Sequence, residues 1–231
     1  MIPRHEWPLL SVVVPIVLYI QYDMSNTIIR FRKVTDMRFE KGHKETTRKH
    51  IVEVASERFR KDGIAAVGIA TAMADAGLTH GGFYAHFESK EDLVREAMEA
   101  AFTQSKARHD AVRKPGPAGL EAYIRSYLRS SHRDTPERGC AAATLVAEIA
   151  RSGEATRGAF ASRLEIIFDR IEEHLPAEIP GADRRSIAIG IFSILMGTIQ
   201  MSRIFVDQAE SETVLESGIK SALKLAAIEP L

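Results

Sequence analysis

The chain has 231 residues, 45% of them hydrophobic and 27% charged, which is the composition of a folded protein rather than a disordered one. Its 31 basic and 31 acidic residues cancel, so any basic surface for nucleic acid has to be local. A single cysteine excludes an intramolecular disulfide framework and is typical of a protein in the reducing cytoplasm, where we expect this chain to reside.

The first part of the chain, residues 1–36, differs from the rest. Residues 9–20 form an apolar run that contains Pro15 and is shorter than the roughly twenty residues that span a bilayer. The run is as long as a signal-peptide core, but no small-residue cleavage site follows it. We interpret residues 1–36 as a disordered or mis-called extension before a start at Met37. A membrane-associating segment is the alternative.

From Lys44 onward, apolar residues recur at helical spacing, and no alternating strand pattern of useful length is present. A proline–glycine break at residues 114–117 is the best internal boundary. A Thr135–Pro136 pair predicts the start of one later helix, with Val146 among its inward residues. The sequence therefore predicts an all-α fold with helices over residues 44–62, 69–76, 79–87, 90–108, 120–128, 136–149, 160–175, 187–206 and 213–227.

The run at residues 187–206 is apolar on nearly every side. Such a helix either spans a membrane or is buried on all sides. Small residues such as Gly190, Ser193 and Gly197 suit close packing of helices, and nothing around the run shows the charge asymmetry of a membrane protein. We expect this helix and the last one, residues 213–227, to pack in a four-helix interface between two copies of the chain.

Residues 74–93 predict two short helices joined by a tight turn and followed by the start of a third. Gly77 lies where the chain has to reverse. Thr79 is placed to cap a helix over residues 79–87, and Ser89 and Asp92 form a capping box for the next helix. This arrangement is typical of the helix-turn-helix unit that reads DNA.

The same stretch also matches a known pattern in detail. The residues that carry the match are Gly63, Gly77, Leu78, Thr79, Gly81, Phe83, Tyr84, Phe87, Ser89, Lys90, Glu91 and Leu93. With them, residues 63–93 resemble the DNA-binding domain of the tetracycline-repressor (TetR) family of bacterial transcription regulators. The position before the first short helix, usually Ser or Thr in the family, is Gly68 here, and Gly82 and Ala85 also replace bulkier residues of the reading helix.

The resemblance implies an N-terminal three-helix DNA-binding domain over residues 37–90 and a larger helical ligand-binding and dimerisation domain over residues 91–231. It further implies a homodimeric transcriptional regulator, most simply a repressor, that binds double-stranded operator DNA and releases it when a small-molecule effector binds. The alternative is a ligand-binding protein that keeps the fold with lost or weak affinity for DNA. The small side chains of the reading helix and the zero net charge motivate that alternative.

Candidate DNA contacts lie on the reading helix and on its neighbours. A hydroxyl and an imidazole at the helix start are placed for phosphates or base edges, and a tyrosine one turn later for a phosphate. A lysine in the first turn of a helix is disfavoured by the helix dipole, and a nearby phosphate would account for it. The candidates are Thr79, His80, Gly81, Tyr84, His86 and Lys90, with Lys44 and Arg48 from the first helix. Packing within the domain is the alternative for Tyr84, and an ordinary solvated face for the first-helix residues.

Effector contacts are less specified by the sequence. The candidates are the aromatic and methionine residues of the middle helices, each of which is equally compatible with plain core: Tyr123, Tyr127, Phe160, Phe168, Phe192 and Met196. Cys140 is either a redox-responsive thiol at a helix start or a small buried group. The sequence contains no His-Glu-x-x-His, Gly-x-Ser-x-Gly or phosphate-loop motif, so we predict neither an enzyme, nor a cofactor, nor a metal site.

Overall fold

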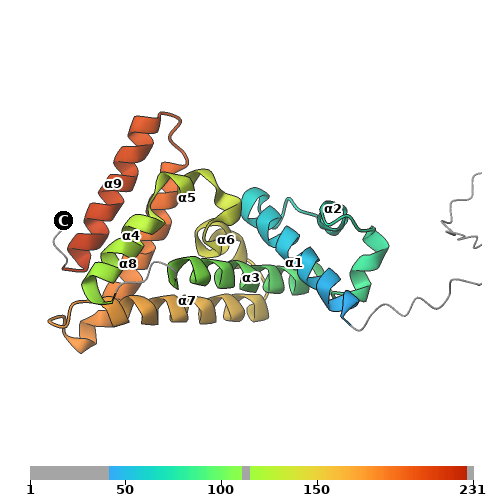
Figure 1. Cartoon of the computed structure of the whole chain (residues 1–231), viewed down its shortest axis with the longest axis horizontal. Coiled ribbons are helices and arrows are strands. Elements are labelled where there is room, and N and C mark those ends of the chain that lie inside the picture. Colours follow the sequence, from blue (N-terminus) through green and yellow to red (C-terminus); the bar gives the residue numbers. More distant parts are fainter. Residues whose placement is uncertain (1–41, 111–114, 228–231) are drawn as a thin grey trace, which may run out of the picture. The chain divides into compact units, whose positions relative to one another are not determined.

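The computed structural model describes residues 42–110 and 115–227, and within those ranges every regular element is a helix (Figure 1). The predicted all-α fold is confirmed. The predictions for residues 1–36 lie outside the described residues. The described residues from Lys44 onward belong to one compact unit.

The N-terminal region consists of four elements: α1 (His43–Asp62), α2 (Ile69–Asp75), the 3₁₀-helix η1 (His80–Ala85) and α3 (Lys90–Asp110). The helix α1 buries Ile51, Ala55 and Phe59 along one face, as their spacing predicts. The turns that follow α1 and α2 use glycines with positive φ, which is +90° at Gly63 and +72° at Gly77. Glycine adopts this conformation without steric cost, so these two residues allow the chain to reverse after each helix.

The reading helix differs from the prediction in two respects. It is a short 3₁₀-helix, with the Gly82 N–H donating to the Thr79 carbonyl at 3.0 Å, and not an α-helix over residues 79–87. Thr79 does precede the helix, but its side chain makes no capping hydrogen bond. Two consecutive glycines, Gly81 and Gly82, lower the α-helix propensity of this segment, which accounts for the tighter and shorter helix.

The start of α3 is capped largely as predicted. The Asp92 N–H donates to the Ser89 hydroxyl at 3.1 Å, which is one half of a capping box. For the other half, the Asp92 carboxylate accepts the backbone N–H of Glu88 at 3.3 Å, whereas a full capping box would use the N–H of Ser89. This cap orients α3, which continues from the helix-turn-helix into the rest of the molecule.

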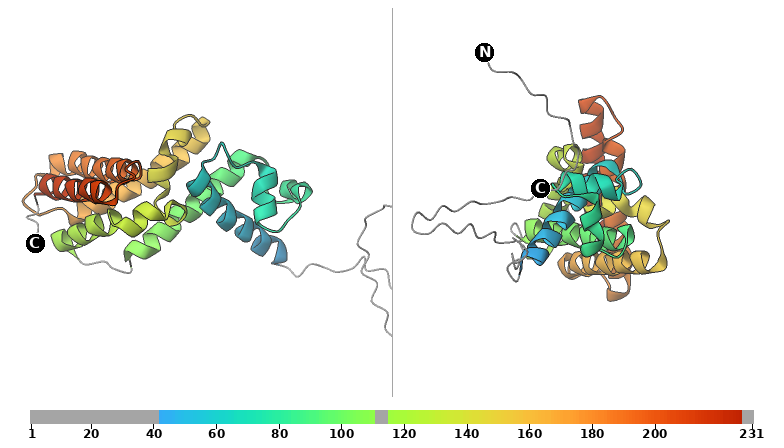
Figure 2. Two further views of the ribbon diagram at one scale, coloured as in Figure 1. Left: turned by 90° about the horizontal axis from the view of Figure 1, so that it is seen from above. Right: turned by 90° about the vertical axis from the view of Figure 1, so that its right-hand side faces the viewer.

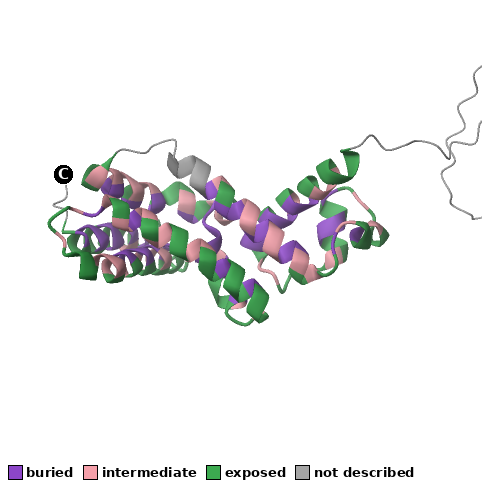
Figure 3. Ribbon diagram, turned by 90° about the horizontal axis from the view of Figure 1, so that it is seen from below, coloured by how far each residue is buried: buried purple, intermediate pink, exposed green. Residues whose placement is uncertain are grey.

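The C-terminal region is a bundle in which α8 and α9 lie side by side and α7 runs along α3 (Figures 1 and 2). Buried residues gather on the faces that the helices turn toward one another (Figure 3). Its elements are α4 (Gly116–Tyr127), α5 (Ser130–Asp134), the 3₁₀-helix η2 (Pro136–Arg138), α6 (Ala141–Ile149), α7 (Glu154–His174), α8 (Gly181–Ser202) and α9 (Gln208–Leu225).

Two predictions about α6 are wrong. Thr135 and Pro136 open only the short η2, because the Thr135 hydroxyl donates to the carbonyl of Ser131 at 2.6 Å instead of capping a following helix. The helix α6 begins five residues later, after Cys140. Val146, expected to point inward, is 38% exposed, while Leu145 and Ile149 are buried.

The helix α8 is the only described helix that is long and apolar enough, by length and composition, to cross a membrane. It ends at Ser202, so the apolar residues 204–206 lie beyond it and are exposed. Ala188, Leu195 and Ile199 lie in the core, whereas Ile189, Gly197 and Met201 face outward. The predicted partner for the outward stripe, a second copy of the chain, stays a prediction. The predicted domain boundary between residues 90 and 91 also stays a prediction. It falls in the first turn of α3.

Candidate nucleic-acid interface

Four of the predicted DNA contacts form one exposed surface on η1, which we call the reading surface: Thr79, His80, Gly81 and Tyr84. The Tyr84 side chain is 66% exposed, and its ring stands edge-on to that of buried Phe83, with 5.2 Å between the centroids. Phe83 stacks in turn on buried Phe87 at 5.4 Å. The two phenylalanines are core residues, and they hold the reading surface toward solvent.

His86 is the residue that follows η1. It is partly buried, and its Nδ1 atom has no hydrogen-bond partner. Burial lowers the pKa of His86, and the positive charges of Lys44 and Arg48 lower it further. The structure therefore does not place His86 with the four residues of the reading surface.

The predicted cations are largely engaged within the protein. The Arg48 Nε donates to the Glu96 carboxylate of α3 at 3.0 Å, and its guanidinium lies 4.4 Å from the centroid of the Phe87 ring. The hydrogen bond to Glu96 raises the pKa of Arg48, although burial opposes it. The Lys90 ammonium donates to the Ile64 carbonyl at 2.6 Å, which supplies an internal reason for a cation in the first turn of α3. Lys44, in contrast, is exposed at the start of α1.

Two contacts that the sequence did not reveal join this region to the rest of the chain. The Glu148 carboxylate of α6 accepts the backbone N–H groups of Ile64 at 2.9 Å and Ala65 at 2.7 Å. Arg60, buried in α1, donates to the Gly139 carbonyl at 2.9 Å. Both partners are more than seventy residues away in sequence, so no local motif could have predicted either bond.

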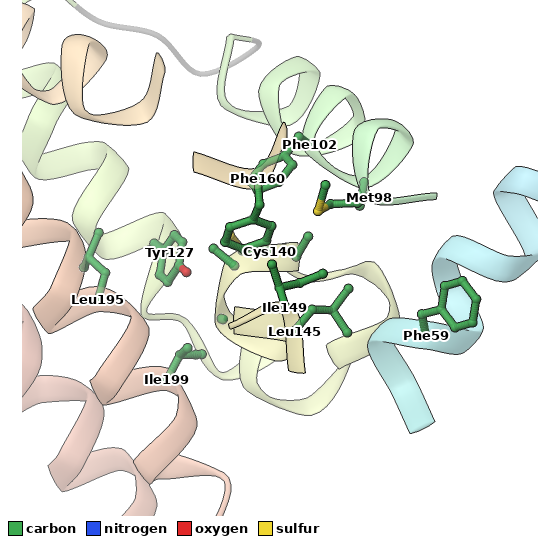
Figure 4. Close-up of a cluster of buried hydrophobic side chains, with 14 of the residues drawn as sticks. Phe59, Met98, Phe102, Tyr127, Cys140, Leu145, Ile149, Phe160, Leu195 and Ile199 are labelled. Carbon is green, nitrogen blue, oxygen red and sulfur yellow. The ribbon is translucent and has the colours of Figure 1, made fainter. Parts of the chain in front are cut away.

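Four of the six effector candidates form a chain of rings between α4, α7 and α8. The centroid distances are 6.0 Å for Tyr123 and Tyr127, 6.1 Å for Tyr127 and Phe192, and 6.0 Å for Phe192 and Phe168. Met196 of α8 is partly buried and packs against the same core. Phe160 packs elsewhere, against Phe102 of α3 at 5.4 Å (Figure 4).

The core around Tyr127 is polar as well as aromatic. The Tyr127 hydroxyl is buried without a hydrogen-bond partner among the described residues, and it points toward Cys140 (Figure 4). Burial, together with the nearby Cys140, raises the pKa of Tyr127 well above its usual value. Cys140 itself is only 6% exposed, which agrees with its interpretation as a small buried group. Among the residues that the structure describes, no three His, Cys, Asp or Glu side chains are grouped to hold a metal ion.

The sequence of the N-terminal region matches the family described as "Bacterial regulatory proteins, tetR family" over residues 51–97. Residues 51–97 therefore form a DNA-binding domain of the tetR type. The matched residues run from α1 into α3 and include the turn glycines Gly63 and Gly77, the reading surface and the α3 cap.

Individual tetR-type relatives agree with this assignment. The transcriptional regulator AcrR of Shigella flexneri is 36% identical over 59 residues, which are 26% of this chain and 27% of AcrR. The chain thus aligns with little more than a quarter of that curated relative. A TetR-family transcriptional regulator from Streptomyces coelicolor is 26% identical and covers 77% of this chain and 88% of its own, with a TM-score of 0.62. A TetR-family regulator from Cytophaga hutchinsonii shares the fold with a TM-score of 0.68 at 20% identity, covering 81% of this chain and 97% of its own.

Proposed function

We propose that this chain is a cytoplasmic, homodimeric transcription regulator, most simply a repressor, that binds operator DNA through the reading surface and releases it when a small molecule binds the C-terminal bundle. The observation that carries the proposal is the exposed surface of Thr79, His80, Gly81 and Tyr84, held outward by the buried pair Phe83 and Phe87 in a tetR-type helix-turn-helix. The proposal assigns no catalytic step to the chain.

The chemistry of the reading surface supports contacts of two kinds. The hydroxyls of Thr79 and Tyr84 suit phosphate oxygens, which position a protein on DNA without reading its sequence. The His80 imidazole is the side chain of this surface best suited to a base edge. Gly81 adds no side chain, so the backbone can approach the duplex closely. We therefore expect few direct base contacts in each half-site.

The test of DNA binding uses the double-stranded fragment upstream of the protein's own gene, titrated at several salt concentrations. Tyr84→Ala is expected to weaken binding by about tenfold or more, as the loss of an interfacial aromatic contact. Tyr84→Phe is the matched control, because it separates the hydroxyl from the ring. Binding that is absent at low salt, or unchanged by Tyr84→Ala, would overturn the proposal.

The proposed dimer uses the outward face of α8 and its neighbour α9. An open groove runs along this face, lined by Ile194, Gly197, Thr198, Met201, Thr213, Val214, Ser217, Gly218 and Ser221. Covering it with a second copy buries an apolar stripe that is otherwise exposed to water. Two reading surfaces would then meet half-sites about 34–36 Å apart, or a multiple of that distance, on a roughly palindromic operator.

The dimer is tested with Gly197→Arg. Nothing lies within 4 Å of a Cβ at Gly197 in the single chain, so the new side chain fits the monomer and obstructs only a partner. Gly158→Arg is the matched control, because Gly158 is also helical, exposed and open, but lies on α7. Sedimentation is expected to show a monomer for Gly197→Arg and a dimer for the control. A wild-type monomer, or a dimer that survives Gly197→Arg, contradicts the proposed interface.

The proposed effector site is the ring chain from Tyr123 to Phe168, which gives apolar contacts with one unpaired polar group, the Tyr127 hydroxyl. An effector has to bind the DNA-incompetent arrangement more tightly than the competent one. A coupling free energy of about 1–3 kcal/mol would weaken DNA binding by roughly 5- to 150-fold.

A second candidate function is a ligand-binding protein with lost or weak affinity for DNA. The internal bonds of Arg48 and Lys90 favour it, because both cations are engaged within the protein rather than free for phosphates. The salt dependence distinguishes the two functions. A regulator loses affinity steeply as salt increases, in proportion to the phosphates that it neutralises, whereas the second candidate shows no specific complex even at low salt.

A further inference from the structure

The His132 imidazole of α5 bridges two helices through both of its nitrogen atoms. Nδ1 lies 2.6 Å from the backbone carbonyl of Tyr127 at the end of α4. Nε2 accepts the backbone N–H of Cys140, immediately before α6, at 3.0 Å. The ring also meets the Tyr127 ring edge-on, with 4.7 Å between the centroids. The side chain thus ties the end of α4 to the start of α6.

These two bonds require one protonation state. A carbonyl oxygen only accepts, so Nδ1 has to carry a hydrogen, and an N–H only donates, so Nε2 has to keep its lone pair. Both bonds exist together only in the neutral Nδ1–H tautomer of His132. Protonation at Nε2 would set two N–H donors against each other and break the bond to Cys140.

The segment that His132 holds also carries the contact to α1. A Cβ on Gly139 would lie 2.7 Å from Nε2 of His132, so only glycine allows the backbone to pass this close to the ring. The Gly139 carbonyl in turn accepts from Arg60 at 2.9 Å, and the same guanidinium donates to the Ser56 carbonyl and the Gln104 side chain. Because Arg60 is buried, a shift of Gly139 would break one of the hydrogen bonds of its guanidinium inside the core.

We propose, resting on the DNA-binding function proposed above, that His132 is a positioning residue for α1. In its neutral form it keeps the Gly139 carbonyl on Arg60 and α1 in the DNA-competent position. Its protonation releases that contact and lowers the affinity for DNA. The bridge begins at Tyr127, so it also connects the proposed effector site to the helix-turn-helix.

The surroundings of the imidazole add to the effect of protonation. The Arg203 guanidinium donates to the His132 carbonyl at 2.9 Å, so a protonated ring would lie near a second cation. The titratable and charged groups around the ring are Tyr123 and Tyr127 of α4, Arg133 and Asp134 of α5, Glu137 of η2, Cys140 before α6, Arg203 after α8 and Arg60 of α1.

The test compares the affinity of the full chain for its upstream DNA fragment at about pH 8 and about pH 5.5, the range in which histidines titrate. His132→Gln supplies a donor and an acceptor but does not titrate. Acidification is expected to weaken wild-type binding at least about fivefold more than it weakens binding by His132→Gln. His174→Gln is the matched control, because His174 also bonds a backbone carbonyl, that of Arg170, but lies on α7 outside the bridge. The DNA affinity of His174→Gln should show the same pH dependence as that of the wild type. Protonation of His80 on the reading surface affects all three proteins alike, so it cancels in the comparison.

A second variant, Arg60→Lys, keeps the positive charge but lacks the forked donors of arginine. It should bind DNA more weakly at both pH values and lose the pH difference attributed to His132. Equal pH dependence in the wild type and His132→Gln overturns the proposal, as does a nitrogen NMR spectrum in which the hydrogen of His132 is on Nε2.

If no variant binds DNA at any pH, the DNA-binding function fails, and the bridge is judged from the signal of the Arg60 Nη1–H group, which donates to the Gly139 carbonyl. Acidification should then accelerate hydrogen exchange at this group in the wild type but not in His132→Gln. An equal response in the two proteins overturns the proposal in that case as well.

Discussion

The helix-turn-helix region and the C-terminal bundle arrange their polar side chains differently. On η1, Thr79, His80 and Tyr84 lie outside a small core of phenylalanines. In the bundle, Tyr127 and Arg133 are buried, and Arg133 bonds Ser211 and Gln208 of α9 from within the fold. A local sequence motif can therefore predict the side chains that meet an outside partner. It cannot predict the polar side chains that connect helices distant in sequence. Four comparisons of variants test this difference, from the largest expected effect to the smallest.

Phe192→Ala should cost about 3–5 kcal/mol of unfolding free energy, because it removes a fully buried ring from the aromatic chain of the bundle. Tyr84→Ala removes a ring of similar size from the reading surface and should change stability by no more than about 0.5 kcal/mol. Urea denaturation at one fixed protein concentration measures both, since the stability of a dimer depends on concentration. Similar losses in the two variants would contradict the contrast between the regions.

Glu148→Gln tests the contact between the two regions. The carboxylate accepts two backbone N–H groups, whereas an amide offers a single oxygen, so one of the two N–H groups loses a hydrogen bond to a charged acceptor, at a cost of about 1.5–3 kcal/mol. Exposed Glu173 on α7 provides the control, and Glu173→Gln should leave the denaturation midpoint in place. A Glu148→Gln protein as stable as the wild type would show that the α1–α2 loop does not depend on α6.

Gly77→Ala should destabilise the protein by about 1–2 kcal/mol, because alanine is strained at a φ of +72°. Gly81→Ala is the matched substitution on η1, where φ is not positive and nothing lies within 4 Å of an added Cβ. It should be neutral or slightly stabilising. The midpoint of thermal denaturation measures both effects. Equal midpoints in the two variants would show that the positive φ at Gly77 does not make alanine costly there.

The smallest expected effect is a pH dependence at His86. Its pKa is lowered from 6.5, first by burial and then by the charges of Lys44 and Arg48. The unfolded chain therefore takes up this proton first, and stability falls as the pH falls below about 6.5. His86→Gln should make that fall shallower, and Lys44→Ala should do so to a smaller extent. Denaturation midpoints between about pH 5 and pH 8 measure the slope, and an unchanged slope in His86→Gln contradicts the assignment.

The sequence predicted most of the backbone around the reading surface. Gly77 and Ser89 each specify a local conformation that needs no distant partner, and both act as predicted. The sequence failed where a distant group, a competing local acceptor or a weak local propensity decides. The two glycines of η1 shorten the reading helix, and the Ser131 carbonyl binds the Thr135 hydroxyl.

The candidate site shows the same division. The exposure of Tyr84 on η1 agrees with a side chain aimed at a partner, as its place in the motif suggested. The internal roles of Arg48 and Lys90 depend on Glu96 and on the Ile64 carbonyl, which come from other elements. Charge and helix position alone do not distinguish such a cation from one that is free for phosphate.

The Glu148 and Arg60 contacts also determine how this DNA-binding segment can be moved between proteins. A chimaera that joins residues 44–97 to the bundle of another relative inherits two loop N–H groups and a buried guanidinium, but not the carboxylate and carbonyl that receive them here. Such a graft would need an acceptor at the positions of Glu148 and Gly139 before its operator preference could be transplanted. The exchangeable module of this protein is therefore the helix-turn-helix together with the two ends of α6.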